Sequence, residues 1–391
     1  MPAAPFNPLV ADLSAPPVPS VFAWARAYDG AAGPMIDLSQ AVPGYPPHPD
    51  LFAWLAEAAS ARANAGYGPI EGEAPLREAY AAEVSAVYGA PVTAENIHIT
   101  AGCNQAFMAT VQAIAASGDA VALTDPFYFN QETTLAMMGI RRELIPLDPA
   151  SGFVPTIEGI EAALAKGVKA VALVSPNNPT GAIYPADLLR QTFEACRKAG
   201  AFLILDETYR DFLPGGDRPH DLLSIPGWEE NLILLYSFSK SFCIPGHRLG
   251  AITAGPRAVS EIAKVMDNLQ ICAPRAPQAA VAKAIPALKA WREDNRIEIL
   301  RRAETLKGVM TKLPAWKMDS LGAYFAFIRH PFTGQDSAHV AERLAKKAGV
   351  LCIPGAYFGD DCQDYLRFAF ANADSATIEG LVSRLSTFTL D

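Results

Sequence analysis

Hydroxyl, amine and guanidinium side chains follow one another closely just past the middle of this chain. Ser237, Ser239 and Lys240 come directly after the apolar run 232–236 (LILLY), and Arg248 stands eight residues beyond the lysine. The run has the length and composition of a strand buried on both faces. Hydroxyls and a guanidinium group can hold a phosphate, and an amine can condense with an aldehyde to a Schiff base. The stretch therefore predicts a site for a phosphate-bearing aldehyde, although taken alone it also fits a solvated corner between a strand and a loop.

The composition predicts a folded protein of two domains that does not bind nucleic acid. With 391 residues, the chain exceeds the size at which a single hydrophobic core keeps growing. Hydrophobic residues make up 50% of the chain and charged residues 19%, which supplies enough apolar surface for cores of that size. The net charge of −9, without a cluster of lysine and arginine, is unlike that of a nucleic-acid-binding surface.

The six cysteines and six histidines are dispersed, and their spacing predicts no metal site. Such scattered cysteines are typical of reduced thiols in a cytosolic protein. Residues 1–20 lack the basic and apolar regions of a secretory signal, and no run of about 18 apolar residues predicts a membrane span. We therefore expect a cytoplasmic protein without a metal and without membrane attachment.

Strand-like and helix-like segments alternate along the first two thirds of the chain. Such alternation predicts an α/β domain with a mostly parallel sheet that helices cover on both faces. The expected strands span residues 97–100, 120–124, 140–147, 168–174, 201–205 and 232–236. The expected helices span residues 20–28, 51–65, 75–88, about 105–116, 157–165 and 186–199.

Polar side chains gather where these strands end. Asn178, Asp206, Tyr209, Ser237 and Lys240 all follow a predicted strand within a few residues. Ligands of parallel α/β sheets bind outside the carboxyl ends of the strands. This placement predicts a ligand site, and the glycine turn 101–105 could add backbone N–H groups for an anion, although it also fits a merely tight turn.

The two ends of the chain complete the expected organisation. Residues 1–19 are rich in proline and alanine and predict an extended arm, either a disordered tail or a segment that crosses to a neighbouring subunit. A helical region over 276–313, interrupted at Pro286, is expected to lead into a smaller α+β domain. That domain would have strands near 323–328 and 365–370, a strand-and-turn segment over 350–359, and helices over 337–348 and 375–385.

Pyridoxal 5′-phosphate (PLP) is a phosphate-bearing aldehyde whose chemistry matches these groups. Lys240 would carry the aldehyde and, once released, move a proton at the substrate α-carbon. Asp206 would pair with the pyridinium nitrogen and keep it protonated. Tyr209 and Asn178 would hydrogen-bond the phenolic oxygen. Asp206 also fits a helix N-cap, and Asn178 also fits an ordinary turn residue.

Further residues are predicted around the cofactor and the substrate. Tyr128 would stack on the ring, although between two phenylalanines it also fits an aromatic core. Arg367 stands in an apolar strand, and a buried arginine needs an anion such as a substrate carboxylate. The predicted phosphate contacts are Gly102, Cys103, Asn104, Ser237, Ser239 and Arg248.

From about Ile36 to its C-terminus, the chain resembles the fold-type I PLP-dependent aminotransferases of class I/II. The Asn-Pro-Thr-Gly sequence and the Ser-x-Ser-Lys with an arginine eight residues on are specific, and the whole set in this order leaves little room for chance. The matching motifs are YGPIEG (67–72), AGCNQA (101–106), DPFY (125–128), NNPTG (177–181), DETY (206–209), SFSK (237–240), GHRLG (246–250), PGAYFG (354–359) and LRF (366–368).

The resemblance implies the PLP-dependent transferase fold, with a large domain on a mostly parallel seven-stranded sheet and a smaller α+β domain. It divides the chain into an N-terminal arm with part of the small domain (1–40), a large PLP-binding domain (41–285) and a small C-terminal domain (286–391). It gives the residues above the same roles, with Arg367 as the clamp for the substrate α-carboxylate. It also implies a homodimer with shared active sites, in which Tyr67 reaches the phosphate across the interface.

By the resemblance, the protein moves an amino group from an L-amino acid to a 2-oxo acid by a ping-pong mechanism. A PLP-dependent carbon–sulfur β-lyase would use the same cofactor residues and stays an alternative. A non-catalytic PLP-binding module is disfavoured because every catalytic position is filled. Where many relatives have glycine near the substrate carboxylate, this chain has residues 40–43 (QAVP). Ala41 and Asn178 are therefore predicted to contact the substrate, and acidic, aromatic and small amino acids all remain open.

Overall fold

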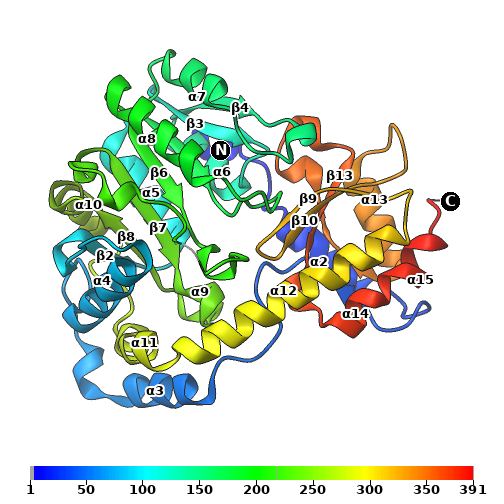
Figure 1. Cartoon of the computed structure of the whole chain (residues 1–391), viewed down its shortest axis with the longest axis horizontal. Coiled ribbons are helices and arrows are strands. Elements are labelled where there is room, and N and C mark those ends of the chain that lie inside the picture. The colour runs from blue at the N-terminus through cyan, green and yellow to red at the C-terminus, as the bar shows by residue number, and fades with distance from the viewer. Residues whose placement is uncertain (1–3, 217, 391) are drawn as a thin grey trace.

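The computed structural model describes residues 4–216 and 218–390, which form a larger and a smaller part (Figure 1). The larger part is built on one seven-stranded sheet, in which all strands are parallel except β8, which is antiparallel to both of its neighbours. The mostly parallel sheet is therefore confirmed. Its order is β2 (Ile97–Thr100), β8 (Gly250–Ala254), β7 (Leu232–Ser237), β6 (Phe202–Asp206), β5 (Ala170–Val174), β3 (Ala120–Asp125) and β4 (Arg141–Pro146).

Helices cover both faces of this sheet because the central strands are apolar on both sides. In β5, Val171 and Leu173 face one core, while Ala170 and Ala172 face the other. Burial of these alternating side chains is the main stabilising term. The first core is closed by α3 (Pro49–Ser60), α4 (Ala74–Tyr88), α7 (Ile157–Leu164), α8 (Ala186–Ala199) and α11 (Arg275–Ala287). The second core is closed by α5 (Cys103–Ile114), α6 (Phe129–Met137) and α10 (Pro256–Leu269).

The smaller part is an α+β unit to which both halves of the chain contribute. The parallel pair of β1 (Ile36–Asp37) and β11 (Val350–Leu351) joins the N-terminal region to it. The 23-residue helix α12 (Lys289–Thr311) runs along both parts (Figure 1). Its antiparallel sheet has the order β12 (Ile353–Pro354), β13 (Tyr365–Ala369), β10 (Phe325–Arg329) and β9 (Lys317–Gly322). Its other helices are α13 (Ser337–Arg343), α14 (Ser375–Glu379) and α15 (Leu381–Ser386).

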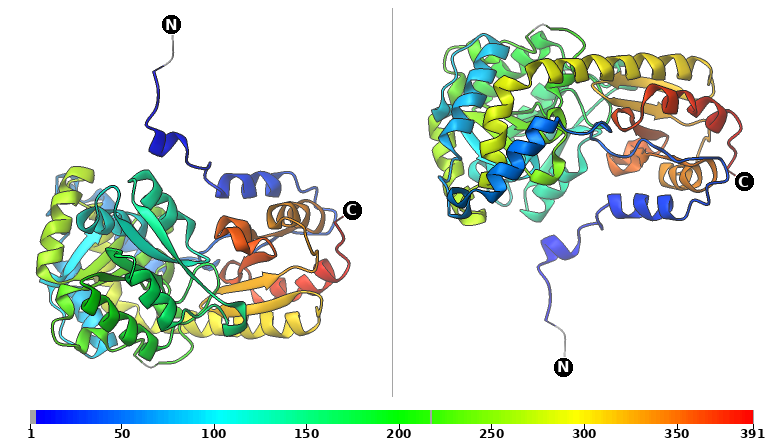
Figure 2. Two further views of the ribbon diagram at one scale, coloured as in Figure 1. Left: turned by 90° about the horizontal axis from the view of Figure 1, so that it is seen from above. Right: turned by 90° about the horizontal axis from the view of Figure 1, so that it is seen from below.

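The N-terminal segment departs from the expected extended arm. It contains α1 (Pro8–Ala11) and α2 (Val18–Arg26), and Figure 2 shows the described residues before α1 reaching away from the body of the protein. The predicted N-cap Ser20 lies inside α2, because Pro17 and Pro19 supply helical φ values that start the helix earlier. Residues 1–3 of the predicted arm lie outside the described residues.

Three other predicted helices are broken or shifted. The helix expected over 51–65 ends at Ser60 and is followed by a separate 3₁₀ turn, Arg62–Ala65. The helical region expected over 276–313 is interrupted at Leu288 rather than at Pro286. Pro286 lies inside α11, one residue before this helix ends. Gly380 separates α14 from α15, because glycine gives up more conformational freedom in a helix than other residues. Among the described residues, no helix is both long and apolar enough to cross a membrane.

Candidate active site

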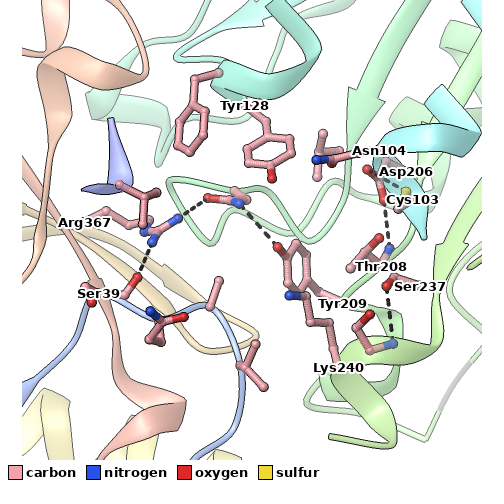
Figure 3. Close-up of a pocket in the computed structure, with 18 of the residues that line it drawn as sticks. Ser39, Cys103, Asn104, Tyr128, Asp206, Thr208, Tyr209, Ser237, Lys240 and Arg367 are labelled. Carbon is pink, nitrogen blue, oxygen red and sulfur yellow. Dashed lines mark hydrogen bonds between the residues drawn. The ribbon is translucent and has the colours of Figure 1, made fainter. Parts of the chain in front are cut away.

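A cavity of about 230 Å³ lies where the carboxyl ends of the large sheet's strands meet the smaller part. Figure 3 shows Arg367 on one side of it, Asp206 on the other, and Lys240 between them. The structure thus brings together residues that are far apart in the sequence, such as Ser39 and Arg367, which are separated by 328 positions. The predicted residues that line the cavity are Ala41, Cys103, Asn104, Tyr128, Asn178, Asp206, Tyr209, Ser237, Ser239, Lys240, Arg248 and Arg367.

Lys240 is held on α9 (Phe238–Ser241), a single helical turn directly after β7. The hydroxyl of Ser237 caps this turn by accepting a hydrogen bond from the Ser239 N–H at 3.3 Å. Burial lowers the pKa of Lys240 to about 8, and the positive charges of Arg248 and Arg367 act in the same direction. A neutral, nucleophilic amine is therefore accessible near neutral pH.

We expect the rate at which the PLP-free protein captures PLP to rise with pH around 8. The neutral amine is the nucleophile, and it makes up about a tenth of Lys240 one pH unit below the pKa and about nine tenths one unit above it. Rapid mixing with PLP over a pH series would give this profile, with a free lysine derivative of ordinary pKa as the control. A profile that follows the control would contradict the lowered pKa of Lys240.

Asp206 stands at the end of β6 with 6% of its surface exposed. Its Oδ1 accepts a hydrogen bond from the Thr208 N–H at 3.0 Å, and its Oδ2 lies 3.4 Å from both Cys103 Sγ and Gln131 Nε2. Burial raises the pKa of Asp206, so a cation beside it would stabilise the ionised form. The N-cap alternative is wrong, because the helical turn that follows is capped by Tyr209.

Arg367 starts a chain of hydrogen bonds that crosses the cavity wall. Its Nη1 donates to Asn178 Oδ1 at 3.0 Å, and Asn178 Nδ2 donates to the Tyr209 hydroxyl at 3.3 Å. Its Nη2 donates to the carbonyl of Ser39 at 2.6 Å. Only 4% of Arg367 is exposed, and its Nε has no hydrogen-bond partner among the described residues. Burial lowers the pKa of Arg367, because a charge removed from water is disfavoured unless an anion balances it.

A second set of groups surrounds the N-terminus of α5. Gly102 precedes this helix with φ +90°, and Arg248 Nη2 donates to the carbonyl of Ala101 at 3.2 Å. The buried Ser239 Oγ lacks a hydrogen-bond partner among the residues that the structure describes. Free helix N–H groups, a guanidinium and an unused hydroxyl together suit a phosphate. Gly102 itself is not part of the cavity wall, but its lack of a side chain leaves room for the guanidinium group of Arg248.

Replacing Gly102 by alanine is expected to weaken PLP binding at least about 10-fold, because the added Cβ would overlap the guanidinium of Arg248. Gly118 offers a matched control: its φ is +91°, and a Cβ there meets no heavy atom of the described chain within 4 Å. Both variants are expected to lose about 1–3 kcal/mol of stability from backbone strain. Equal PLP affinities of the two variants, measured by titration, would contradict the proposed role of this turn.

The other predicted residues take different positions. Tyr128 precedes α6 and lines the cavity, and its hydroxyl accepts a hydrogen bond from Asn130 Nδ2 at 2.8 Å. The carbonyl of Ala41 accepts a hydrogen bond from the Tyr324 hydroxyl at 3.0 Å. Tyr67 is 80% exposed and does not line the cavity of its own chain. Gln40 and Val42, from the stretch 40–43 that the sequence analysis singled out, also line the cavity. Sequence reasoning missed Val18, Ser39, Phe129, Gln131, Val174 and Thr208, which no local pattern marks.

These features fit PLP. The raised pKa of Asp206 suits a protonated ring nitrogen, the unused hydroxyl of Ser239 suits a phosphate, and Lys240 is an amine of lowered pKa in the cavity wall, as an aldehyde requires. Residues 33–385 match the family "Aminotransferase class I and II". The chain belongs to this family.

Named relatives of this aminotransferase agree with the assignment. The aromatic aminotransferase ISS1 of Arabidopsis thaliana is 28% identical, over 82% of this chain and 80% of its own. An aspartate aminotransferase of Pyrococcus horikoshii is 27% identical, over 81% of each chain. The solved structure of the Thermus thermophilus aspartate aminotransferase with maleate has a TM-score of 0.89 and 25% identity, over 98% of this chain and 99% of that one. The predicted fold, PLP dependence and transaminase activity are thereby confirmed.

Proposed function

We propose that this aminotransferase acts on an L-amino acid and a 2-oxo acid with Lys240, Asp206 and Tyr209 as its catalytic residues and Arg367 as the ligand of the α-carboxylate. The observation that supports this most is the position of Arg367. It is a buried cation with an unused N–H group in the described structure, and it lines the same cavity as Lys240. A carboxylate is the anion that a guanidinium fork binds best in such a place.

When bound, PLP supplies an aldehyde that condenses with amines and a ring that takes up negative charge. Asp206 holds a proton at the ring nitrogen, since its buried carboxylate is stabilised by that positive charge. The neutral amine of Lys240 takes the proton from the substrate α-carbon, which its lowered pKa permits. Tyr209 and Asn178 bind the phenolic oxygen, and Arg367 orients the substrate through its carboxylate.

We also propose a homodimer with shared active sites. Tyr67 is 80% exposed in the loop 66–72, and the neighbouring loop exposes 41% of Leu269 and 39% of Ile271. The two loops touch, because the Gly68 N–H donates to Cys272 Sγ at 3.3 Å. Exposed apolar side chains beside an exposed tyrosine favour an interface with a second copy.

Tyr67→Phe tests the shared site, because it removes only the hydroxyl. We expect about a 10-fold loss of PLP affinity from the loss of one hydrogen bond to the phosphate. Sedimentation equilibrium would give the oligomeric state, and PLP titration above and below the dimer dissociation constant would show whether the loss requires the dimer. The shared site would be contradicted if the protein is a monomer and Tyr67→Phe leaves its PLP affinity unchanged.

Two other assignments belong to this proposal. The division into residues 1–40, 41–285 and 286–391 is supported by two apolar cores that each draw mainly on one part, with a few side chains such as Tyr209 and Phe327 crossing between them. A cytoplasmic location is supported by six cysteines that are all free in the described structure.

The half-reaction without a 2-oxo acid tests the proposed activity. Holoenzyme mixed with an L-amino acid should lose the visible absorbance of bound PLP as the amine form of the cofactor accumulates, and one 2-oxo acid should form per site. Subsequent addition of a different 2-oxo acid should restore the absorbance. Release of pyruvate and ammonia from cysteine-like substrates, with the absorbance retained, would instead identify a lyase.

A further inference from the structure

The proposed contacts to aldehyde, phosphate and α-carboxylate already use every cation of the cavity. Within residues 4–216 and 218–390, the only lysines and arginines that line it are Lys240, Arg248 and Arg367. The second carboxylate of an acidic substrate would therefore meet no further positive charge among the described residues of the chain that forms the cavity. A carboxylate moved from water into such a site without a partner is strongly disfavoured.

The wall beside Arg367 contains apolar side chains besides the polar groups of Ser39 and Asn178 that Arg367 contacts. Val18, the first residue of α2, and Phe129 line the cavity. The ring of Phe129 lies 5.5 Å from that of Phe358, and the guanidinium of Arg367 lies 5.2 Å from the Phe358 ring. Because the side chain and the α-carboxylate of an amino acid leave the same carbon, a substrate held by Arg367 would place its side chain close to this wall.

A second hollow adjoins the cavity and is uncharged as well. The two share Asn104, and the second is lined by Met108, Met137 and Leu269 together with amide, hydroxyl and alanine side chains. No lysine, arginine, aspartate or glutamate of the described chain lines it. This neighbouring hollow therefore brings no charged group of the described chain to the cavity.

The surface that a second copy would bring to the site adds apolar groups too. Next to Tyr67, the loop after α10 exposes Leu269 and Ile271. The nearest cation after that loop is Arg275, the first residue of α11, whose Nε donates to Glu73 Oε1 at 2.5 Å and whose Nη1 donates to the carbonyl of Ala63 at 2.5 Å. Arg275 is thus already paired within its own chain.

We infer that the amino donor of this enzyme is an L-amino acid with an uncharged, mainly apolar side chain, selected by Val18, Val42 and Phe129. The inference rests on the proposed transamination and adds its substrate class. It also gives a use to Val18 and Val42, which line the cavity and take no part in the proposed contacts to PLP.

The half-reaction of the holoenzyme tests the inference directly. The bleaching rate would be measured with L-phenylalanine, L-leucine and L-methionine, and with L-aspartate and L-glutamate, each over a concentration series. We expect the second-order rate constant of bleaching for the best apolar amino acid to be at least about 100-fold larger than that for either acidic amino acid. An equal or faster reaction with either acidic amino acid would overturn the inference. If no amino acid bleaches the holoenzyme, the proposed transamination itself fails and the inference fails with it.

A charge added to this wall provides a second test. Val42→Arg is expected to raise the rate with L-aspartate relative to L-leucine at least about 10-fold, whereas Val42→Met, which adds length without charge, is expected not to raise it. PLP absorbance and circular dichroism would show that each variant is folded and loaded. Where Val42→Arg does not load PLP, Val18→Arg takes its place, because Val18 lines the cavity from a different segment, α2. No relative gain with aspartate in the loaded variant would overturn the selecting role of these residues.

Discussion

Lys240→Ala is expected to lower kcat at least about 10⁴-fold, as removal of a nucleophile that also transfers protons does in other enzymes. Lys240 is half-buried and lines the cavity together with Asp206, and its pKa is lowered to about 8. Both the covalent attachment of PLP and the movement of the α-proton therefore depend on this one amine. Steady-state assays with excess PLP would measure the loss.

Two controls separate chemistry from folding. Lys240→Arg keeps a positive charge but has no amine that condenses with an aldehyde, so it is expected to be as inactive as the alanine variant. Borohydride treatment should fix PLP covalently to the wild-type protein and to neither variant. Activity of the alanine variant within about 100-fold of wild type would show that another group moves the proton.

Arg367→Gln is expected to reduce kcat/KM for amino acid substrates roughly 30- to 4,000-fold. This range corresponds to the about 2–5 kcal/mol that the loss of one partner of a buried, hydrogen-bonded charge pair costs. Arg367 fits that description because it is 4% exposed and fixed by Asn178 and by the carbonyl of Ser39. Arg367→Lys keeps the charge without the two-pronged geometry, so an intermediate loss is expected.

The α-carboxamide of the same amino acid shows whether the loss arises at the carboxylate. Wild-type enzyme should use this neutral analogue poorly, and Arg367→Gln should use it about equally poorly, because neither forms the ion pair. If Arg367→Gln loses as much activity toward the amide as toward the acid, the loss does not arise from the missing contact to the substrate α-carboxylate. The hydrogen bonds from Arg367 to Asn178 and from there to Tyr209 make the phenolic-oxygen contacts the first alternative.

Much of the larger part was predictable because its signals are local. The strand 97–100 and the helix 186–199 have the predicted bounds, and the strands at 120–125, 170–174, 202–206 and 232–237 lie within one or two residues of the prediction. Their apolar runs are short, continuous and bounded by turn residues, a pattern that is typical of strands buried on both faces. Polar residues at the carboxyl ends of those strands then located the site.

Weaker local signals gave no prediction. The strand β8 (GAITA) and the strand β9 (KMDSLG) contain glycine and polar residues, and the sequence reasoning did not identify either. Both are held in place by neighbouring strands, β8 between β2 and β7 and β9 beside β10. Pairing with a neighbour overrides weak strand propensity, and the identity of that neighbour cannot be read from the segment itself.

The sequence by itself determined the chemistry of this protein: an amine, a carboxylate and hydroxyls at the ends of successive strands, in an order that matches one family. Only the tertiary structure decided which other residues contact these groups. Cys103 and Gln131 meet Asp206 across 103 and 75 residues of sequence, and Ser39 meets Arg367 across 328. Val18 joins the cavity from the N-terminal segment. Such contacts leave no local pattern, because they arise from the packing of whole elements rather than from the spacing of residues within one.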